Sequence, residues 1–177
     1  MGLGSAQPLN ILVIDSSRPL NFALNIGKLE HIADYCPIKN VSELVNILLL
    51  KCGTSSNHRV IKRLTIIGHG NPKGVFIGED WVDDTTLSNF SNDLAKLVPF
   101  FSRAGDAVVT LFACMTGRNE KLLGLLSSLL GGVTVRAMTA SQNAFIPSEQ
   151  GSVTQCIYSQ CSNSGRLVWD KTNEDPP

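Results

Sequence analysis

The chain has 177 residues, 43% of them apolar, and this length and composition favour one domain with a packed core. Its 15 basic and 15 acidic residues give a formal net charge of zero, so overall charge does not favour nucleic acid or an anionic membrane surface as a partner. Because no apolar run reaches the ~18 residues of a membrane span, we expect no membrane-spanning segment.

Apolar runs and helical periodicity alternate along the chain. A continuous apolar run at residues 10–15 and mostly apolar segments at 60–67, 107–113 and 133–140, each bounded by turn residues, predict four core strands. Amphipathic or capped segments predict helices at residues 20–34, 41–51, 86–97 and 120–130, the second of them with Ser42 as its N-cap. A short outer strand or hairpin is predicted at 74–78, and an antiparallel pair at 153–158 and 166–169.

This order of elements predicts an α/β fold with a mostly parallel sheet between layers of helices. Ligands of such sheets bind beyond the carboxyl ends of the strands. Asp15, His69 and Cys114 each stand at the end of a predicted strand. We therefore expect all three residues at one edge of the sheet.

A cysteine with a histidine beside it is a nucleophile with its base. His69 lies between Gly68 and Gly70, and Cys114 follows the apolar run that ends at Ala113. The imidazole could take the thiol proton or stabilise the thiolate, and the amides of Gly70 and Cys114 could bind an oxyanion. A cysteine alone at a strand end is more often a small core residue. On adjacent strand ends, however, the two residues together indicate a thiol hydrolase.

The pattern resembles the caspase-like peptidases of clan CD, which include caspases, separase, clostripain, gingipains, bacterial CHAT proteases and the self-cleaving domains of large bacterial toxins. The similar features are a strand with His-Gly, a strand with Ala-Cys, and Cys-x-x-Gly from Cys114 to Gly117 before a helix. The dyad spacing, 114 − 69 = 45 residues, is close to the ~50 of caspases. The resemblance covers about residues 10–141. Because Gln-Ala-Cys-x-Gly is absent, the chain is more similar to bacterial or effector-type, CHAT-like members than to animal caspases.

The resemblance implies a three-layer α/β/α peptidase domain over residues 9–170, with flexible ends at 1–8 and 171–177. It implies an endopeptidase that cleaves a protein or peptide substrate through a thioester on Cys114. His69 would act as base and then acid, and the amides of Gly70 and Cys114 would form the oxyanion hole. No cofactor or metal is implied, whereas an activating partner or a processing step is common among these peptidases.

The resemblance also suggests where the substrate side chain binds. Clan members set the preference for the P1 residue with a charged residue near the end of the first strand or after the strand that follows the nucleophile. Asp15, Arg18 and Ser141 occupy such places. Asp15 would suit a basic P1 residue and Arg18 an acidic one, although each is more often an ordinary turn or capping residue.

The cysteines and the N-terminus bear on the cellular compartment. Five cysteines occur, an odd number without any Cys-x-x-Cys, so we expect no disulfide framework and a reducing compartment. The N-terminus lacks the basic start and apolar core of a signal peptide. These features predict a cytoplasmic protein or one delivered into a host cytosol.

Two other function classes stay open beside the peptidase. One is a catalytically inactive caspase-like interaction module, and the other is a thiol acyl or amide transferase. The sequence holds no Gly-x-Ser-x-Gly of a serine hydrolase, and its Gly68-His69-Gly70 lacks the further residues of a phosphate-binding loop. Labelling with a thiol-reactive peptide electrophile would separate an enzyme from a binding module.

Overall fold

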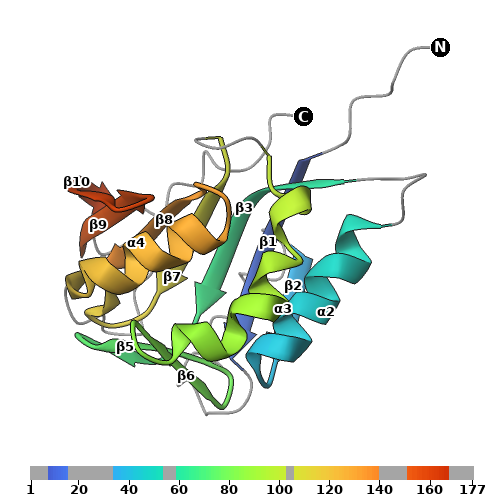
Figure 1. The fold of residues 1–177 in the computed structure, drawn as a ribbon, viewed down its shortest axis with the longest axis horizontal. Coiled ribbons are helices and arrows are strands. Elements are labelled where there is room, and N and C mark those ends of the chain that lie inside the picture. The colour runs from blue at the N-terminus through green and yellow to red at the C-terminus, as the bar shows by residue number, and fades with distance from the viewer. Residues whose placement is uncertain (1–7, 16–33, 54–58, 103–105, 140–150, 168–177) are drawn as a thin grey trace.

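A computed structural model of the chain describes residues 8–15, 34–53, 59–102, 106–139 and 151–167. Its centre is a seven-stranded sheet with the strand order β10-β9-β8-β7-β3-β1-β2 (Figure 1). These strands are β1 (Pro8–Asp15), β2 (Asp34–Ile38), β3 (Val60–Ile67), β7 (Val108–Phe112), β8 (Thr134–Met138), β9 (Gly151–Ile157) and β10 (Gln160–Leu167). A separate three-stranded sheet contains β4 (Gly70–Asn71), β5 (Gly74–Ile77) and β6 (Asp80–Asp83).

The large sheet is mixed and mostly parallel. Strands β2, β1, β3, β7 and β8 pair in parallel, β9 runs antiparallel to β8, and β10 runs antiparallel to β9. The predicted parallel core and the predicted neighbours β3 and β7 are therefore confirmed. The antiparallel pair near the end of the chain is also present, but its second strand, β10, begins at Gln160 and not at the predicted residue 166. The molecule is an α/β protein.

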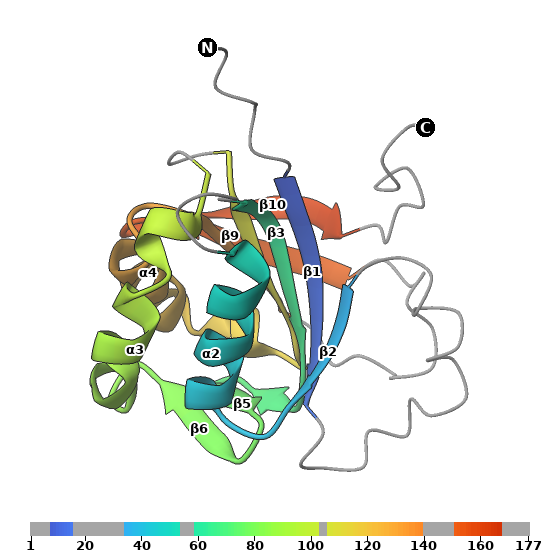
Figure 2. The same ribbon diagram turned by 90° about the vertical axis from the view of Figure 1, so that its right-hand side faces the viewer.

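The described helices cover one face of the large sheet, as Figure 2 shows. They are α2 (Val41–Cys52), α3 (Ser91–Ala95) and α4 (Glu120–Leu129), with short 3-10 helices η1 (Leu87–Phe90), η2 (Val98–Phe100) and η3 (Thr116–Arg118). On β1, Val13 belongs to the core shared with these helices, and Ile14 on the alternate face is also buried. Burial on both faces explains the continuous apolar run. The helix expected at 20–34 lies outside the described residues except for Asp34, which begins β2, so a third layer stays a prediction.

The helix expected at 86–97 and the edge strand β2 also differ from the sequence prediction. The single helix expected at 86–97 is divided into η1, α3 and η2, within a segment rich in serine, asparagine and aspartate, which form helices poorly. One such competing contact is the Ser91 hydroxyl, which donates a hydrogen bond to the Ser88 carbonyl at 2.8 Å. Strand β2 was not predicted, and Pro37 within it argues against a central strand. Its place at the edge of the sheet accommodates a proline, because the missing N–H faces no partner there.

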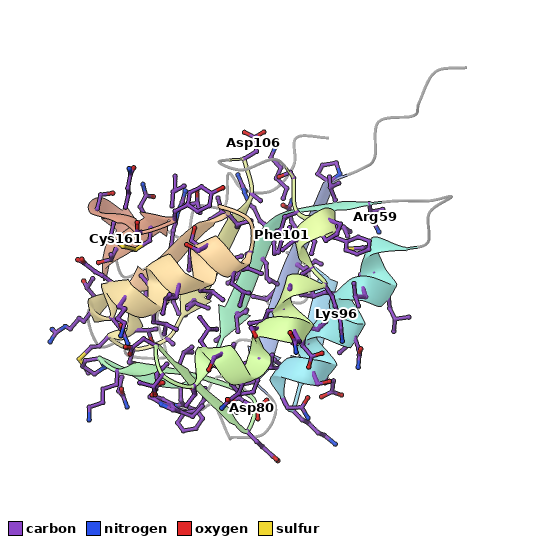
Figure 3. All side chains as sticks on the ribbon, viewed as in Figure 1. Arg59, Asp80, Lys96, Phe101, Asp106 and Cys161 are labelled. Carbon is purple, nitrogen blue, oxygen red and sulfur yellow. A yellow bond between two sulfur atoms is a disulfide. The ribbon has the colours of Figure 1, made fainter. Side chains whose placement is uncertain are left out.

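A disulfide joins Cys156 on β9 to Cys161 on β10, a bridge that the sequence analysis, which expected no disulfide framework, did not predict. The two residues are register partners across a tight turn, with Cα atoms 4.1 Å apart, and Figure 3 shows Cys161 on this hairpin beside α4. A spacing of five residues therefore places the two sulfurs opposite each other once the strands pair. Because disulfides persist mainly in oxidising compartments, this bridge removes the support for a reducing one.

Helix α2 gives a first testable prediction, because its N-cap is Asn40 rather than Ser42. The Asn40 side chain accepts a hydrogen bond from the Glu43 N–H at 2.7 Å. Asn40→Ala is expected to lower the free energy of unfolding by about 1 kcal/mol, the usual worth of such a cap. The matched control Ser42→Ala removes an exposed first-turn hydroxyl and should change stability by less than about 0.5 kcal/mol. Urea unfolding of both variants checks this, and an equal loss in both would contradict the assignment.

Candidate active site

The parallel pairing of β3 and β7 brings the two predicted dyad residues to one edge of the sheet. Ile67, the last residue of β3, is the register partner of Phe112, the last residue of β7. The Gly68 N–H continues the ladder by donating to the Phe112 carbonyl at 3.4 Å. His69 and Cys114 each follow two residues after this last pair, and both have exposed or partly exposed side chains.

The segment that carries the histidine packs directly against the segment that carries the cysteine. A Cβ atom built on Gly70 would lie 2.9 Å from the Ala113 Cβ and 3.1 Å from the Gly74 carbonyl oxygen, and it would also collide with the Thr116 hydroxyl. Gly70 follows His69, and Ala113 precedes Cys114. The absence of a side chain at position 70 is therefore what allows these two loops to touch.

The small sheet holds the histidine segment below the ends of the parallel strands (Figures 1 and 2). The Phe76 N–H donates a hydrogen bond to the His69 carbonyl at 2.8 Å. The next pair of residues facing each other across β4 and β5 is Gly70 and Val75. Antiparallel pairs alternate between hydrogen-bonded and non-hydrogen-bonded, so the Gly70 N–H points away from β5.

The chain turns sharply directly after the cysteine. Met115 has a left-handed backbone with φ of 55°, which costs a residue with a side chain about 1–2 kcal/mol. The Arg118 N–H then donates to the Met115 carbonyl at 3.0 Å and closes the turn of η3. Unfavourable backbone conformations of this kind cluster at active sites and switch regions. The turn separates Cys114 from α4 and leaves it at the sheet edge.

Two polar residues of the cysteine loop, which the sequence analysis did not single out, contact the histidine segment. The buried Thr116 hydroxyl donates to the Gly74 carbonyl at 3.1 Å. The Asn119 side-chain amide donates to the Lys73 carbonyl at 2.5 Å. Asparagine ahead of a helix is a recognisable cap signal, and Asn119 does cap α4. The partner of Thr116 is 42 residues away, so no local pattern pointed to it.

Of the three predicted substrate-binding residues, Asp15 is the one among the described residues; Arg18 and Ser141 lie outside them. Asp15 ends β1, the neighbour of β3, and is 2% exposed. Its Cβ lies 3.8 Å from the position of a Cβ atom on Gly68. The structure therefore places the start of the histidine loop beside Asp15, as expected from the strand order.

The acidic residues on β6 and in the loop that follows it, Asp80, Asp83 and Asp84, make contacts within the fold. Asp80 accepts a hydrogen bond from the Val41 N–H at 2.9 Å, and Figure 3 shows Asp80 on the small sheet near α2. Hydrogen bonds from Thr85, Thr86 and Trp81 hold the pKa of Asp83 well below its ordinary value. The Lys121 ammonium lies 2.8 Å from Asp84 and lowers the pKa of that carboxyl, helped by Asn119. Among the described residues, no group of three or more histidine, cysteine or acidic side chains could hold a metal ion.

Three described cysteines lie outside the disulfide, and they differ in accessibility. Cys36 and Cys52 are buried, whereas Cys114 is partly exposed. Burial raises the pKa of Cys52 to about 11, and the nearby Arg59 only partly opposes that shift. A thiol reagent at neutral pH should therefore react with Cys114 in preference to Cys52.

The architecture defines an α/β protein with a mixed, mostly parallel sheet and a histidine and a cysteine at adjacent strand ends. The family described as Domain of unknown function (DUF4347) matches residues 39–152, which is more than half of the chain and includes both residues. The chain belongs to this family. No curated protein and no solved structure matches it. No helix among the described residues is both long enough and apolar enough to cross a membrane.

Proposed function

We propose that the protein is a caspase-like cysteine endopeptidase with His69 and Cys114 as its dyad. The observation that supports this most directly is the packing of Gly70 against Ala113, because it brings together the chain segments next to the two residues. The parallel pairing of β3 with β7 and the partial exposure of Cys114 add to it. A cysteine with a positioned histidine at an accessible strand end is the arrangement that nucleophilic catalysis requires.

In the proposed reaction, the Cys114 sulfur attacks the carbonyl carbon of the scissile peptide bond after its proton passes to His69. The amides of Gly70 and Cys114 stabilise the resulting oxyanion. The tetrahedral intermediate collapses as the C–N bond breaks, and His69 returns the proton to the leaving amine. A thioester on Cys114 remains. Water, deprotonated by His69, then attacks the thioester, releases the carboxylic acid and restores the thiol.

The substrate preference proposed from Asp15 is a basic P1 residue. Asp15 is buried at the same sheet edge, and its carboxylate has the charge and hydrogen-bond acceptors that suit lysine or arginine. Cleavage of an unbiased peptide library by the full chain would test this preference. Accumulation of cleavage after acidic residues would contradict it and favour Arg18.

The proposed function is tested by covalent labelling with a peptidyl electrophile that has an arginine at P1. We expect intact-mass analysis to show one adduct, which peptide mapping assigns to Cys114. Cys114→Ala should abolish the adduct, while the matched controls Cys36→Ala and Cys52→Ala should retain it, because those thiols are buried. An adduct on another cysteine, or peptide cleavage that survives in Cys114→Ala, would overturn the mechanism.

The same experiment separates the two remaining classes. An inactive module would give no adduct and no cleavage, even after limited processing of the chain. A transferase would form the adduct but would release the acyl group to an added amine rather than to water. Comparison of product formation with and without an amine acceptor distinguishes that outcome from hydrolysis.

A further inference from the structure

Two hydrogen bonds join the loop after Cys114 to the hairpin after His69. Thr116 donates to the Gly74 carbonyl at 3.1 Å, and Asn119 donates to the Lys73 carbonyl at 2.5 Å. We call this pair of hydrogen bonds the inter-loop contact. The two donors come from residues two and five positions after the cysteine. The acceptors are Lys73, in the turn between β4 and β5, and Gly74, the first residue of β5.

The inter-loop contact is built from well-fixed groups. Thr116 is 0% exposed, so its hydroxyl has lost water as an alternative partner. Asn119 also accepts a hydrogen bond from the Leu122 N–H at 3.0 Å, and its amide donates to Asp84 as well. Asp84 in turn is paired with Lys121. The Asn119 side chain is therefore held by α4 through Leu122, by Asp84 in the loop after β6, and by the hairpin through Lys73.

The hydrogen bonds between β3 and β7 do not reach the two dyad residues. Strands β3 and β7 fix each other only as far as Gly68, so the β ladder does not fix the position of His69 relative to Cys114. Beyond that point the His69 carbonyl is bound to the hairpin through Phe76, and the hairpin is bound to the cysteine loop through the inter-loop contact. The hairpin therefore connects the two residues by a second route.

We propose that Thr116 and Asn119 are positioning residues that set the separation of the His69 imidazole and the Cys114 thiol. This inference rests on the proposed function, because it presupposes that the two side chains act as a dyad. Neither Thr116 nor Asn119 needs to touch a substrate. Loss of either hydrogen bond would free the hairpin to move His69 away from Cys114, and small displacements within a catalytic pair are costly.

The test measures the rate at which iodoacetamide alkylates Cys114 from about pH 5 to about pH 9, where a thiol and an imidazole titrate. Peptide mapping assigns the rate to Cys114, and His69→Ala gives the profile of an uncoupled thiol. We compare the logarithm of the Cys114 alkylation rate at each pH among the variants. For Thr116→Val we expect this value to lie at least halfway from the wild-type value to the His69→Ala value. Thr116→Ser keeps the hydroxyl and should restore the wild-type profile.

Asn119→Ser is the second variant, and it decides the matter if Thr116→Val does not fold. It keeps a side-chain oxygen for the Leu122 N–H but is too short to reach the Lys73 carbonyl. We expect the same change of profile. A lower melting temperature with a wild-type profile in both variants would show a merely structural role and would overturn the inference.

The outcomes also separate this inference from the proposed function. If His69→Ala has the wild-type profile, His69 and Cys114 are not coupled. Both the proposed dyad and the proposed positioning role would then be rejected. If His69→Ala changes the profile while Thr116→Val and Asn119→Ser do not, the dyad stands and the positioning role alone fails. Because iodoacetamide needs no substrate recognition, neither result depends on finding a cleavable peptide.

Discussion

His69→Ala is expected to lower the turnover of peptide cleavage by several orders of magnitude while leaving the fold intact. Without the imidazole, the thiol loses the group that accepts its proton, and the leaving amine loses the group that protonates it. The His69 side chain is exposed and contributes little packing, so the melting temperature should stay close to that of wild type. Steady-state cleavage of a fluorogenic peptide, measured beside thermal unfolding, checks both statements.

A double variant makes this prediction sharper. Because nucleophile and base act as one unit, His69→Ala combined with Cys114→Ala should be no less active than Cys114→Ala alone. The matched surface control is Lys62→Ala, an exposed substitution on β3 that should leave turnover unchanged. Additive losses in the double variant, or turnover of His69→Ala close to wild type, would exclude His69 from the chemistry.

Gly70→Ala is expected to reduce kcat by about 100-fold, the usual cost of displacing catalytic groups by about 1 Å. The added Cβ would lie 2.9 Å from the Ala113 Cβ and 3.1 Å from a backbone oxygen, distances at which a neighbour must move. The segments that carry His69 and Cys114 would therefore separate. The loss should appear in kcat more than in KM, which single-turnover and steady-state assays resolve.

The matched control for Gly70→Ala is Gly124→Ala on α4. A Cβ atom at that position would lie 3.0 Å from the Tyr158 carbonyl oxygen, a close contact in a different part of the molecule but a milder one than the collision with the Thr116 hydroxyl at position 70. It should alter stability and leave kcat unchanged. Equal losses of kcat in both variants would show that the effect of Gly70→Ala reflects general destabilisation and says nothing about the site.

The match between sequence and structure is closest where the apolar pattern is long and regular. The segments Val60–Ile67 and Val108–Phe112 form β3 and β7 as predicted, because apolar residues dominate both and are mostly buried where each strand ends, at Ile66–Ile67 and Leu111–Phe112. The end of α4 before Gly131 and Gly132 was also predicted, and both glycines have positive φ. The segment of η1, α3 and η2 was predicted less well, since short polar residues hydrogen-bond locally and interrupt a helix.

The sequence by itself determined the α/β class, the parallel core and the placement of His69 and Cys114 at strand ends, because these follow from apolar periodicity and chain order. Only the tertiary structure decided the contacts between distant segments: the bridge from Cys156 to Cys161, the packing of Gly70 on Ala113, and the hydrogen bond from Thr116 to Gly74. A periodic pattern records which face of an element is buried. It does not record which backbone group 42 residues away will accept a given proton, because that depends on how the completed elements pack.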